Sequence, residues 1–327
     1  MKILVLNREE MNQVMTMKEA VAAAREALTI YSTGEKDIPF RSNIRIEKGQ
    51  GNALFMPGYV SDLDALGLKI VSVYPENPRK GIPGVPSTMI LLDSETGQVS
   101  AIMDGTCLTQ LRTGAMAGAA TATLAREDAE KFVLIGAGGQ AESQLEAVLS
   151  VRDIKEVHVF SRDPDHARAF ARSHDNHPGV RIRAGDDLDL AISQADIITA
   201  VTTSLEPVFD GSRVRPGTHI NGMGSFTPDM SEIPQEVLGQ SARIYLDSMD
   251  CLIECGNFQK PMKAGNFDPH EITGEVGELL AGRKPGRESE KDVTFFSSTG
   301  NAILDIVTAK KIYDQARAKG MGTWIEL

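Results

Sequence analysis

Cysteine, tryptophan and long apolar runs are scarce in this sequence. Its 327 residues include one tryptophan and three cysteines, Cys107, Cys251 and Cys255. An odd, low cysteine count without a close Cys-x-x-Cys pair is typical of a reducing compartment and excludes a disulfide framework. Two neighbouring thiols do not complete a zinc site, so we expect no bound metal.

Segments that send a protein into or across a membrane are also missing. No stretch approaches the ~18 consecutive apolar residues of a membrane-spanning helix. The apolar part of the N-terminal sequence MKILVLNREEMNQ is too short for a secretion signal and has no small-residue cleavage site after it. We therefore expect a cytoplasmic protein.

Positive charge is in deficit. Lys and Arg number 34 against 45 Asp and Glu, which gives a formal net charge of −11. Nucleic acids and anionic membranes call for a basic face, so neither is an expected partner. A small anionic substrate stays possible, because a few local arginines can make a positive pocket on an acidic protein.

The N-terminal third carries mostly strand signals. After a short strand, Lys2 to Leu6, the capping-box pattern Thr16-Met17-Lys18-Glu19 begins a helix that runs to about Thr33. Its buried stripe is expected at Val21, Ala24, Leu28 and Tyr31. From residue 41 to residue 103, apolar runs of strand length alternate with glycine and proline turns, which favours a largely antiparallel or mixed sheet.

The rest of the chain has a different rhythm. A small-residue helix, Leu108 to Leu124, leads into strands that alternate with helices from Lys131 onward, which is typical of a parallel sheet covered on both faces. The helical segment Ala302 to Lys319 is expected to return to the first domain. We predict an α/β protein with a doubly wound Rossmann domain over residues 119–299. A second, α+β domain is discontinuous and takes residues 1–118 and 300–327.

A dinucleotide site is predicted where the first strand of this parallel sheet meets a helix. The run reads Lys131-Phe-Val-Leu-Ile-Gly136-Ala-Gly138-Gly139-Gln140-Ala141. Gly136 permits the tight turn, Gly138 lets pyrophosphate approach the backbone, and Ala141 lets helix and strand pack closely. The helix N-terminus offers free N–H groups to phosphate. A bare Gly-x-Gly-x-x-Ala is weak evidence, but here it has the strand–turn–helix context that it needs.

The next strand ends in Ser161, Arg162 and Asp163, which bear on the choice of cofactor. An acidic residue at the strand tip would bind the ribose 2′-hydroxyl of NAD. Ser161 with Arg162 suits a 2′-phosphate, so NADP is favoured over NAD. The alternative is that Asp163 restores NAD-type recognition while Arg162 faces solvent.

Two further loops are expected to face the cofactor. Thr199 to Ser204, which include Thr202, and Asn221 to Ser225, which include Met223, follow strands and are small and polar. The alternative is that these loops are merely rich in turn formers.

Three cations interrupt apolar or small-residue stretches in the N-terminal half. They are Arg45, Lys69 and Arg112. A lysine inside a strand such as Leu66-Gly-Leu-Lys-Ile-Val must point to solvent or into a cleft. Taken alone, each of the three is more often a solvated or salt-bridged residue than a site residue.

Motifs along nearly the whole chain, in order, resemble the ornithine cyclodeaminase/μ-crystallin family. They are Arg45, Phe55-Met-Pro, Gly67-Leu-Lys69, Asp93-Ser-Glu-Thr-Gly97, Met103-Asp-Gly, Leu108-Thr-Gln-Leu-Arg112-Thr, Gly136-Ala-Gly-Gly-Gln-Ala, and Ser298-Thr-Gly-Asn-Ala with Asp305. None of them is specific alone, but together they are.

The resemblance implies a substrate-binding domain that also forms a homodimer, beside the Rossmann domain. The family acts on 2-imino or 2-amino acids, so Arg45 and Arg112 would hold the substrate carboxylate. Lys69 would polarise the imine or help proton transfer, which makes Lys69 and Arg112 the candidate catalytic residues. The nicotinamide would deliver hydride to C2. Within the matching motifs, Thr113 and Ser298 are assigned to the cofactor site.

Two positions depart from the ornithine cyclodeaminases that the chain resembles. Those enzymes carry an aspartate in a Gly-Gly-Asp-Cys-Pro-Gly-Lys pattern and a glutamate before the Leu-Met-Pro equivalent, where this chain has Phe226 and Leu54. A cationic side-chain amine needs a carboxylate partner, because an uncompensated buried charge is costly. Asp229, three positions on, replaces the aspartate only if the loop folds differently.

We therefore expect Leu54 and Phe226 to line the substrate site of a reductase of 2-imino acids, for example cyclic ketimines such as 1-pyrroline-2-carboxylate, or of a related amino-acid dehydrogenase. Two alternatives stay open. One is a cyclodeaminase-type lyase that recycles tightly bound NAD without net redox change, and the other is a non-catalytic NADP-binding protein of the μ-crystallin type.

Overall fold

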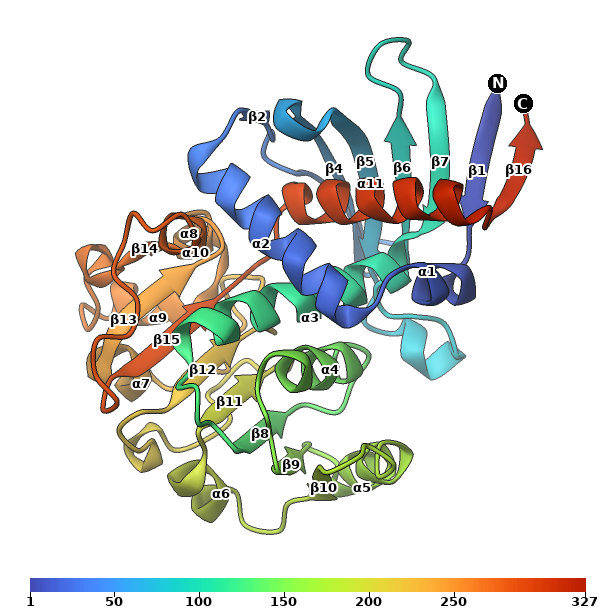
Figure 1. Ribbon diagram of the computed structural model, residues 1–327. Helices are drawn as coiled ribbons and strands as arrows, with labels where there is room; N and C mark the ends of the chain where they lie inside the picture. The colour runs from blue at the N-terminus through green and yellow to red at the C-terminus, as the bar shows by residue number, and fades with distance from the viewer. The chain divides into compact units, whose positions relative to one another are not determined.

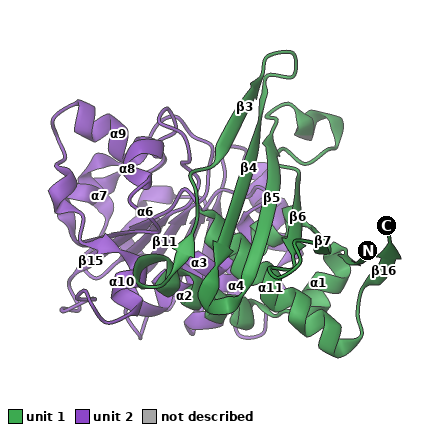
Figure 2. Ribbon diagram, turned by 90° about the horizontal axis from the view of Figure 1, so that it is seen from above, with its two compact units in different colours: residues 1–112, 301–327 green, residues 113–300 purple. Residues whose placement is uncertain are grey.

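The computed structural model describes residues 1–327, with the side chain of Pro78 left out. The chain divides into two compact units, coloured green and purple in Figure 2. Unit 1 is Met1–Arg112 with Asn301–Leu327, and unit 2 is Thr113–Gly300. The sequence placed these divisions after residues 118 and 299.

Unit 1 is built on one sheet with the strand order β16-β1-β7-β6-β5-β4-β2, and β3 also pairs with β4. The strands are β1 (Lys2–Leu6), β2 (Lys36–Asp37), β3 (Ser42–Ile46), β4 (Gly51–Val60), β5 (Ala65–Val73), β6 (Ser87–Leu92), β7 (Val99–Asp104) and β16 (Thr323–Glu326). The run from β4 to β7 is antiparallel and β1 joins β7 in parallel, so the expected mixed sheet is confirmed.

Helices cover one face of this sheet. They are α1 (Arg8–Val14), α2 (Met17–Thr33) and α11 (Ala302–Lys319), with short 3₁₀ turns at η1 (Ser61–Leu63) and η2 (Asn77–Lys80). Helix α11 lies across β4, β5 and β6, and α1 and α2 pack against α11 (Figure 1). The first half of α11 is buried on all sides, which suits its nearly continuous apolar sequence.

The predicted helix bounds in unit 1 agree well with the structure where local capping is clear. Thr16 and Glu19 form the reciprocal capping box that begins α2, as predicted. Tyr31 is a correction to the predicted stripe, because its ring is half-exposed and contacts Lys36. Helix α1 was not predicted, although Asn7 and Glu10 cap it in the same way.

Unit 2 is the predicted Rossmann domain. Its sheet has the order β10-β9-β8-β11-β12-β15-β13-β14, with parallel pairing throughout the described residues. The strands are β8 (Lys131–Ile135), β9 (Glu156–Phe160), β10 (Arg181–Ala184), β11 (Ile197–Ala200), β12 (His219–Gly222), β13 (Ser241–Leu246), β14 (Gly274–Glu275) and β15 (Val293–Ser297). The order reverses between β8 and β11, which is where such folds bind dinucleotides.

Helices flank this parallel sheet. They are α3 (Gly105–Leu124, shared with unit 1), α4 (Ala141–Val151), α5 (Pro164–Ser173), α6 (Leu188–Gln194), α7 (Gln235–Gln240), α8 (Cys251–Glu254), α9 (Gly256–Lys263) and α10 (Val276–Leu280), with 3₁₀ turns η3 (Gly211–Arg213) and η4 (Pro269–Glu271). The short elements after β13 were not predicted. Strand β8 shows why the sheet is buried on both faces, because Phe132 and Leu134 enter one apolar core while Val133 and Ile135 enter another.

None of the described helices is both long enough and apolar enough to cross a bilayer.

Candidate functional site

A buried cluster of opposite charges lies in unit 1. Lys69 Nζ lies 2.6 Å from Asp305 Oδ2, and Arg112 Nε donates to Asp305 Oδ1 at 3.0 Å. All three side chains are buried, and the Lys69 and Asp305 side chains are 1% and 0% exposed. The structure therefore brings together two of the three predicted cations, with a carboxylate to which the sequence reading gave no role.

Strand geometry explains why Lys69 points inward. Lys69 on β5 pairs with Met56 on β4 and with Met89 on β6, and Met89 in turn pairs with Met103 on β7. All three methionines are buried. Residues paired across strands share a face, so Lys69 stands in a row of methionines on the face that α11 covers. The solvent-exposed alternative for Lys69 is excluded, and the salt-bridged alternative holds for both Lys69 and Arg112.

The cluster carries excess positive charge. Two cations share the single carboxylate of Asp305. Arg112 reaches it through Nε, and its two terminal nitrogens have no hydrogen-bond partner in the described part of the chain. The pKa of Lys69 is lowered to about 8, because burial and the charges of Arg112 and Arg41 together outweigh the attraction of Asp305, which raises it. Such a site favours a further anion, which would restore the balance.

Arg45 is not part of this cluster. Arg45 is exposed on β3, where it pairs with Asn52 of β4. The β4 residue that pairs with Lys69 is Met56, four positions further along. At the rise of a strand, Arg45 is therefore displaced from Lys69 by roughly 13 Å along the strand direction. It lines an open depression with Glu47, Gln50, Gly51 and Asn52. Arg41, which directly precedes β3, is the arginine outside the cluster whose charge lowers the pKa of Lys69. The sequence reading missed Arg41, because spacing alone does not tell which end of a strand lies beside a distant lysine.

The two positions that replace carboxylates are apolar in the structure as well. Leu54 pairs with Val71 on β5. Val71 is two residues from Lys69 along that strand, so Leu54 and Lys69 lie on the same face of the sheet. Phe226 is half-buried in the loop after β12. Asp229 is exposed in that loop.

The glycine turn of unit 2 has the geometry that phosphate needs. Gly136 has a φ of +113°, and a Cβ there would lie 2.6 Å from the Val201 carbonyl oxygen, so only glycine fits. Around Gly138 no heavy atom comes within 4 Å of a Cβ position, which leaves open space beside the backbone. Helix α4 then begins at Ala141 without a side-chain cap from Gln140. Gly139 lies within the same turn. These residues fit a dinucleotide pyrophosphate.

The tip of β9 separates the three residues considered for cofactor choice. Ser161 is half-buried and Arg162 is exposed. Asp163 begins α5 as its N-cap, with Oδ1 accepting from the Asp165 backbone at 2.9 Å. The carboxylate of Asp163 is therefore engaged by its own helix, whereas Arg162 lies at the tip with its side chain in solvent.

Other predicted cofactor residues lie at the carboxyl ends of the unit 2 strands or in α3. Thr202 follows β11, Met223 follows β12 and is buried, and Ser298 follows β15. Ser298 accepts from the Gly300 backbone at 2.9 Å. Thr113 is buried in α3. The sequence reading missed Glu232, a buried carboxylate that binds Thr202 and Gly224.

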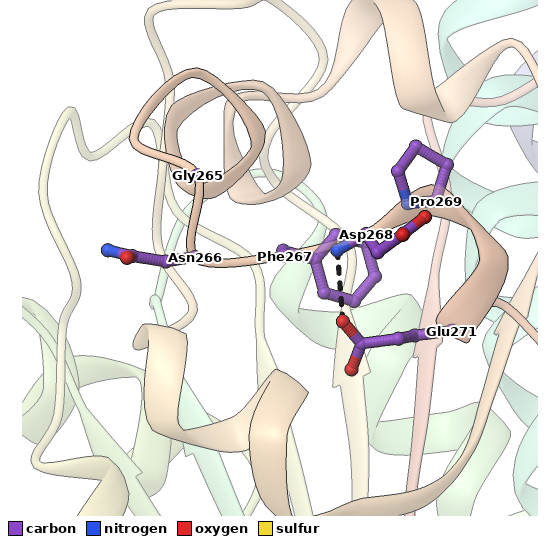
Figure 3. Close-up of a pocket in the computed structure, with 6 residues that line it drawn as sticks. All are labelled: Gly265, Asn266, Phe267, Asp268, Pro269 and Glu271. Atoms are coloured by element: carbon purple, nitrogen blue, oxygen red, sulfur yellow. Dashed lines mark hydrogen bonds between the residues drawn. The ribbon is translucent and has the colours of Figure 1, made fainter.

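A depression in unit 2 lies apart from these residues in the sequence. It is lined by Gly265, Asn266, Phe267, Asp268, Pro269 and Glu271, and Glu271 accepts from the Asp268 backbone at 2.9 Å (Figure 3). That bond is half of the capping box of η4. The depression therefore reflects a capped turn and contains none of the predicted site residues.

Known proteins resemble the chain over its full length. The model of the "Ornithine cyclodeaminase/mu-crystallin family" matches residues 1–320. A Delta(1)-pyrroline-2-carboxylate reductase of Bacillus cereus is 37% identical over 325 residues, covering 99% of this chain and 100% of the relative.

Two solved structures are similar to the whole chain. The Thermococcus litoralis Delta(1)-pyrroline-2-carboxylate reductase in complex with NADH and L-proline has a TM-score of 0.94 at 39% identity, over 98% of this chain and 99% of that one. An archaeal alanine dehydrogenase dimer with bound NAD has a TM-score of 0.92 at 36% identity, over 100% of both chains. The predicted family and fold class are confirmed, and the chain belongs to the ornithine cyclodeaminase/mu-crystallin family.

Proposed function

We propose that this protein is an NAD(P)H-dependent reductase of 2-imino acids, with cyclic ketimines such as 1-pyrroline-2-carboxylate as substrates. The oxidoreductase class that the sequence predicted is confirmed by its relatives, which are reductases of this kind and an alanine dehydrogenase. The observation that carries the proposal for this chain is the buried Lys69–Asp305–Arg112 cluster with its excess positive charge.

The cluster suits a substrate carboxylate. Arg112 uses Nε for Asp305, which directs its two terminal nitrogens elsewhere, and a guanidinium binds a carboxylate best through two parallel N–H bonds. Arg41, whose charge reaches Lys69, takes in this proposal the role that the sequence reading gave to Arg45. Arg112 and Arg41 hold the substrate carboxylate, and Lys69 stands beside it.

Lys69 has the chemistry that an imine reduction requires. Bound NAD(P)H supplies a hydride to C2 of the substrate. The nitrogen must then hold one proton more than the neutral imine, and an ammonium with a pKa of about 8 can donate it near neutral pH. Leu54 and Phe226 leave no carboxylate to bind a side-chain amine, which favours a reductase over a cyclodeaminase.

For the cofactor we propose NADP, with NAD as the alternative. Gly136, Gly138, Gly139, Gln140 and Ala141 hold the pyrophosphate, and Thr113, Thr202, Met223 and Ser298 line the remainder of the dinucleotide site. Ser161 and Arg162 bind the 2′-phosphate, because Asp163 is committed to its N-cap. The NAD and NADH bound in the relatives' structures support a nicotinamide cofactor without deciding its 2′-group.

We also propose a homodimer that forms through the second face of the unit 1 sheet. Opposite the lysine row, Pro57, Leu68, Ile90 and Ile102 pair in register and are half-exposed. An uncovered apolar row on a sheet marks an interface. The related alanine dehydrogenase is a dimer, which favours a second copy as the occupant. Light scattering of Leu68→Glu should show a monomer where the unaltered chain is a dimer.

The decisive experiment is to follow NADPH and NADH oxidation with 1-pyrroline-2-carboxylate, and separately with pyruvate plus ammonia. Turnover of the cyclic imine supports the proposal. Turnover of pyruvate and ammonia alone would make the protein an alanine dehydrogenase, the second candidate that a relative favours. Ammonia release from ornithine without net oxidation would identify a cyclodeaminase, and cofactor binding with no turnover would identify a binding protein.

A further inference from the structure

Glu232 lies buried beside the carboxyl ends of β11 and β12, in the segment before α7. Its Oε2 accepts from the Thr202 backbone N–H at 2.7 Å and from the Thr202 hydroxyl at 2.9 Å. Its Oε1 accepts from the Gly224 backbone N–H at 2.6 Å. Thr202 follows β11 and Gly224 follows β12, so a single carboxylate ties together the loops that leave two neighbouring parallel strands.

This carboxylate has no cationic partner among the described residues. Burial raises its pKa, while the N–H and hydroxyl donors of Thr202, Gly224 and Ser225 lower it. A buried carboxylate without a cation is costly to keep ionised. Perturbed carboxylates of this kind gather at functional sites, because stability alone does not favour them.

The loop that Glu232 holds also borders the glycine turn. The Val201 backbone donates to Ile135 at the end of β8, and the Val201 carbonyl oxygen is the atom that a Cβ on Gly136 would meet. Strands β8 and β11 are the two between which the strand order reverses. The segment fixed by Glu232 is thus one wall of the position where a doubly wound fold takes its dinucleotide.

The backbone around Glu232 leaves little freedom. Asn257 Oδ1 on α9 accepts from the backbone N–H groups of Glu232 at 2.8 Å and Ile233 at 3.1 Å. A Cβ on Gly224 would overlap the Thr202 backbone, so the two loops touch backbone to backbone. Loss of one carboxylate bond would leave a donor unpaired at this contact and separate the loops.

We propose that Glu232 is a positioning residue for the nicotinamide dinucleotide. The ionised carboxylate accepts from both loops and holds them in the arrangement that the cofactor binds, and protonation removes one acceptor and loosens that arrangement. The inference concerns cofactor binding in unit 2 and does not depend on which imino acid is the substrate. The titratable group that faces Glu232 is the Cys255 thiol, whose pKa burial raises to about 11, so it does not titrate near neutral pH.

The test is the affinity for NADH of Glu232→Gln, measured by nicotinamide fluorescence without any substrate. NADH is used because it lacks a titrating 2′-phosphate. A glutamine side chain has only one oxygen, so its NH₂ group must face either the Thr202 or the Gly224 backbone N–H, and that donor loses its acceptor. The affinity for NADH should therefore fall by about tenfold or more near pH 7.5. The matched control is Glu236→Gln, an exposed glutamate at the start of α7, which should bind NADH as the unaltered protein does.

The pH dependence separates a positioning role from a merely structural one. Burial raises the pKa of Glu232, so lowering the pH should protonate it and weaken NADH binding by the unaltered protein, while the affinity of Glu232→Gln changes little. The difference in NADH affinity between the two proteins should therefore narrow as the pH falls. A loss below about twofold near pH 7.5, or a loss that stays constant with pH, would overturn the proposal.

Circular dichroism tells whether Glu232→Gln is folded. If it is not, the unaltered protein decides the matter, because an NADH affinity that is flat down to the pH of unfolding also overturns the proposal. Failure here is distinct from failure of the proposed function. Imine reduction could persist with a Glu232→Gln that binds NADH normally, and Glu232 could hold the cofactor in an enzyme for another substrate.

Discussion

Lys69 and Asp305 form a buried ion pair, with Nζ 2.6 Å from Oδ2. The second oxygen of Asp305 accepts from Arg112, so one carboxylate fixes both cations. It comes from α11, which follows the whole of unit 2 in the sequence. The proposed substrate site is therefore complete only when the end of the chain has packed onto the sheet of unit 1.

Replacing Asp305 by asparagine should reduce both stability and activity. Breaking a buried ion pair costs roughly 3–5 kcal/mol, because the remaining charges stay buried. Imine reduction near neutral pH should fall at least about tenfold, since Asp305 is what raises the pKa of Lys69 against burial. Urea unfolding and initial rates check the two expectations.

The control for Asp305→Asn is Asp314→Asn on the same helix. Asp314 pairs with Lys310 at 2.6 Å and is half-exposed, so its loss should cost no more than about 0.5 kcal/mol and leave the rate unchanged.

The stability lost in Asp305→Asn should shrink as the pH rises. The pKa of Lys69 is lowered in the folded chain, so Lys69 loses its proton at a lower pH there than in the unfolded chain. Once it is neutral, the folded chain no longer carries the unfavourable free energy of a buried, unpaired ammonium. Equal losses in the two variants would remove Asp305 from its assigned role.

The rate of imine reduction should depend on the Lys69 proton. The pKa of Lys69 is about 8, so the ammonium is present below that pH and is lost above it. We expect kcat/KM to decline above about pH 8, and kcat to decline at a higher pH, because a bound carboxylate favours the charged lysine. A pH series with Lys69→Met, which is unbranched like lysine but lacks the ammonium group, checks the assignment. A decline in rate at high pH that survives in this variant belongs to another group.

Arg112→Ala should weaken substrate binding strongly, and Arg45→Ala should not. Loss of a charge-assisted contact costs about 1.5–3 kcal/mol, which corresponds to an increase of about ten- to 150-fold in the KM for an imino acid. Arg45 is exposed and separated from the cluster, so it serves as the matched control. Saturation kinetics with 1-pyrroline-2-carboxylate distinguish them, and a larger effect at Arg45 would return that residue to the substrate site.

Arg162→Ala should change the preference between the two cofactors. If Arg162 binds a 2′-phosphate, affinity for NADPH falls by about 1.5–3 kcal/mol while affinity for NADH is nearly unchanged. Arg168→Ala is a suitable control, because Arg168 is exposed on α5 and pairs with Asp165. Titration of both cofactors by fluorescence checks this, and equal losses for NADPH and NADH would favour NAD recognition instead.

Much of the fold could be read from the sequence because its signals are local. The capping box at Thr16 sets the start of α2, and the strand–turn–helix around Gly136 requires only neighbouring residues. The bounds of α11 agree with the range predicted for it. The short elements between β13 and β15 were missed, because their apolar residues fill a core that distant strands form.

The candidate site could be predicted from the sequence only in part. The glycine turn, the family motifs and the unusual surroundings of Lys69 and Arg112 can be recognised in the sequence alone. The folded chain was needed to show that the charge of Arg41, and not that of Arg45, affects Lys69. It was also needed to show that Asp305 pairs with both cations and that Glu232 joins two loops. These contacts join residues from separate strands and helices, and the direction of a buried side chain is set by the elements that pack around it rather than by its neighbours in the chain.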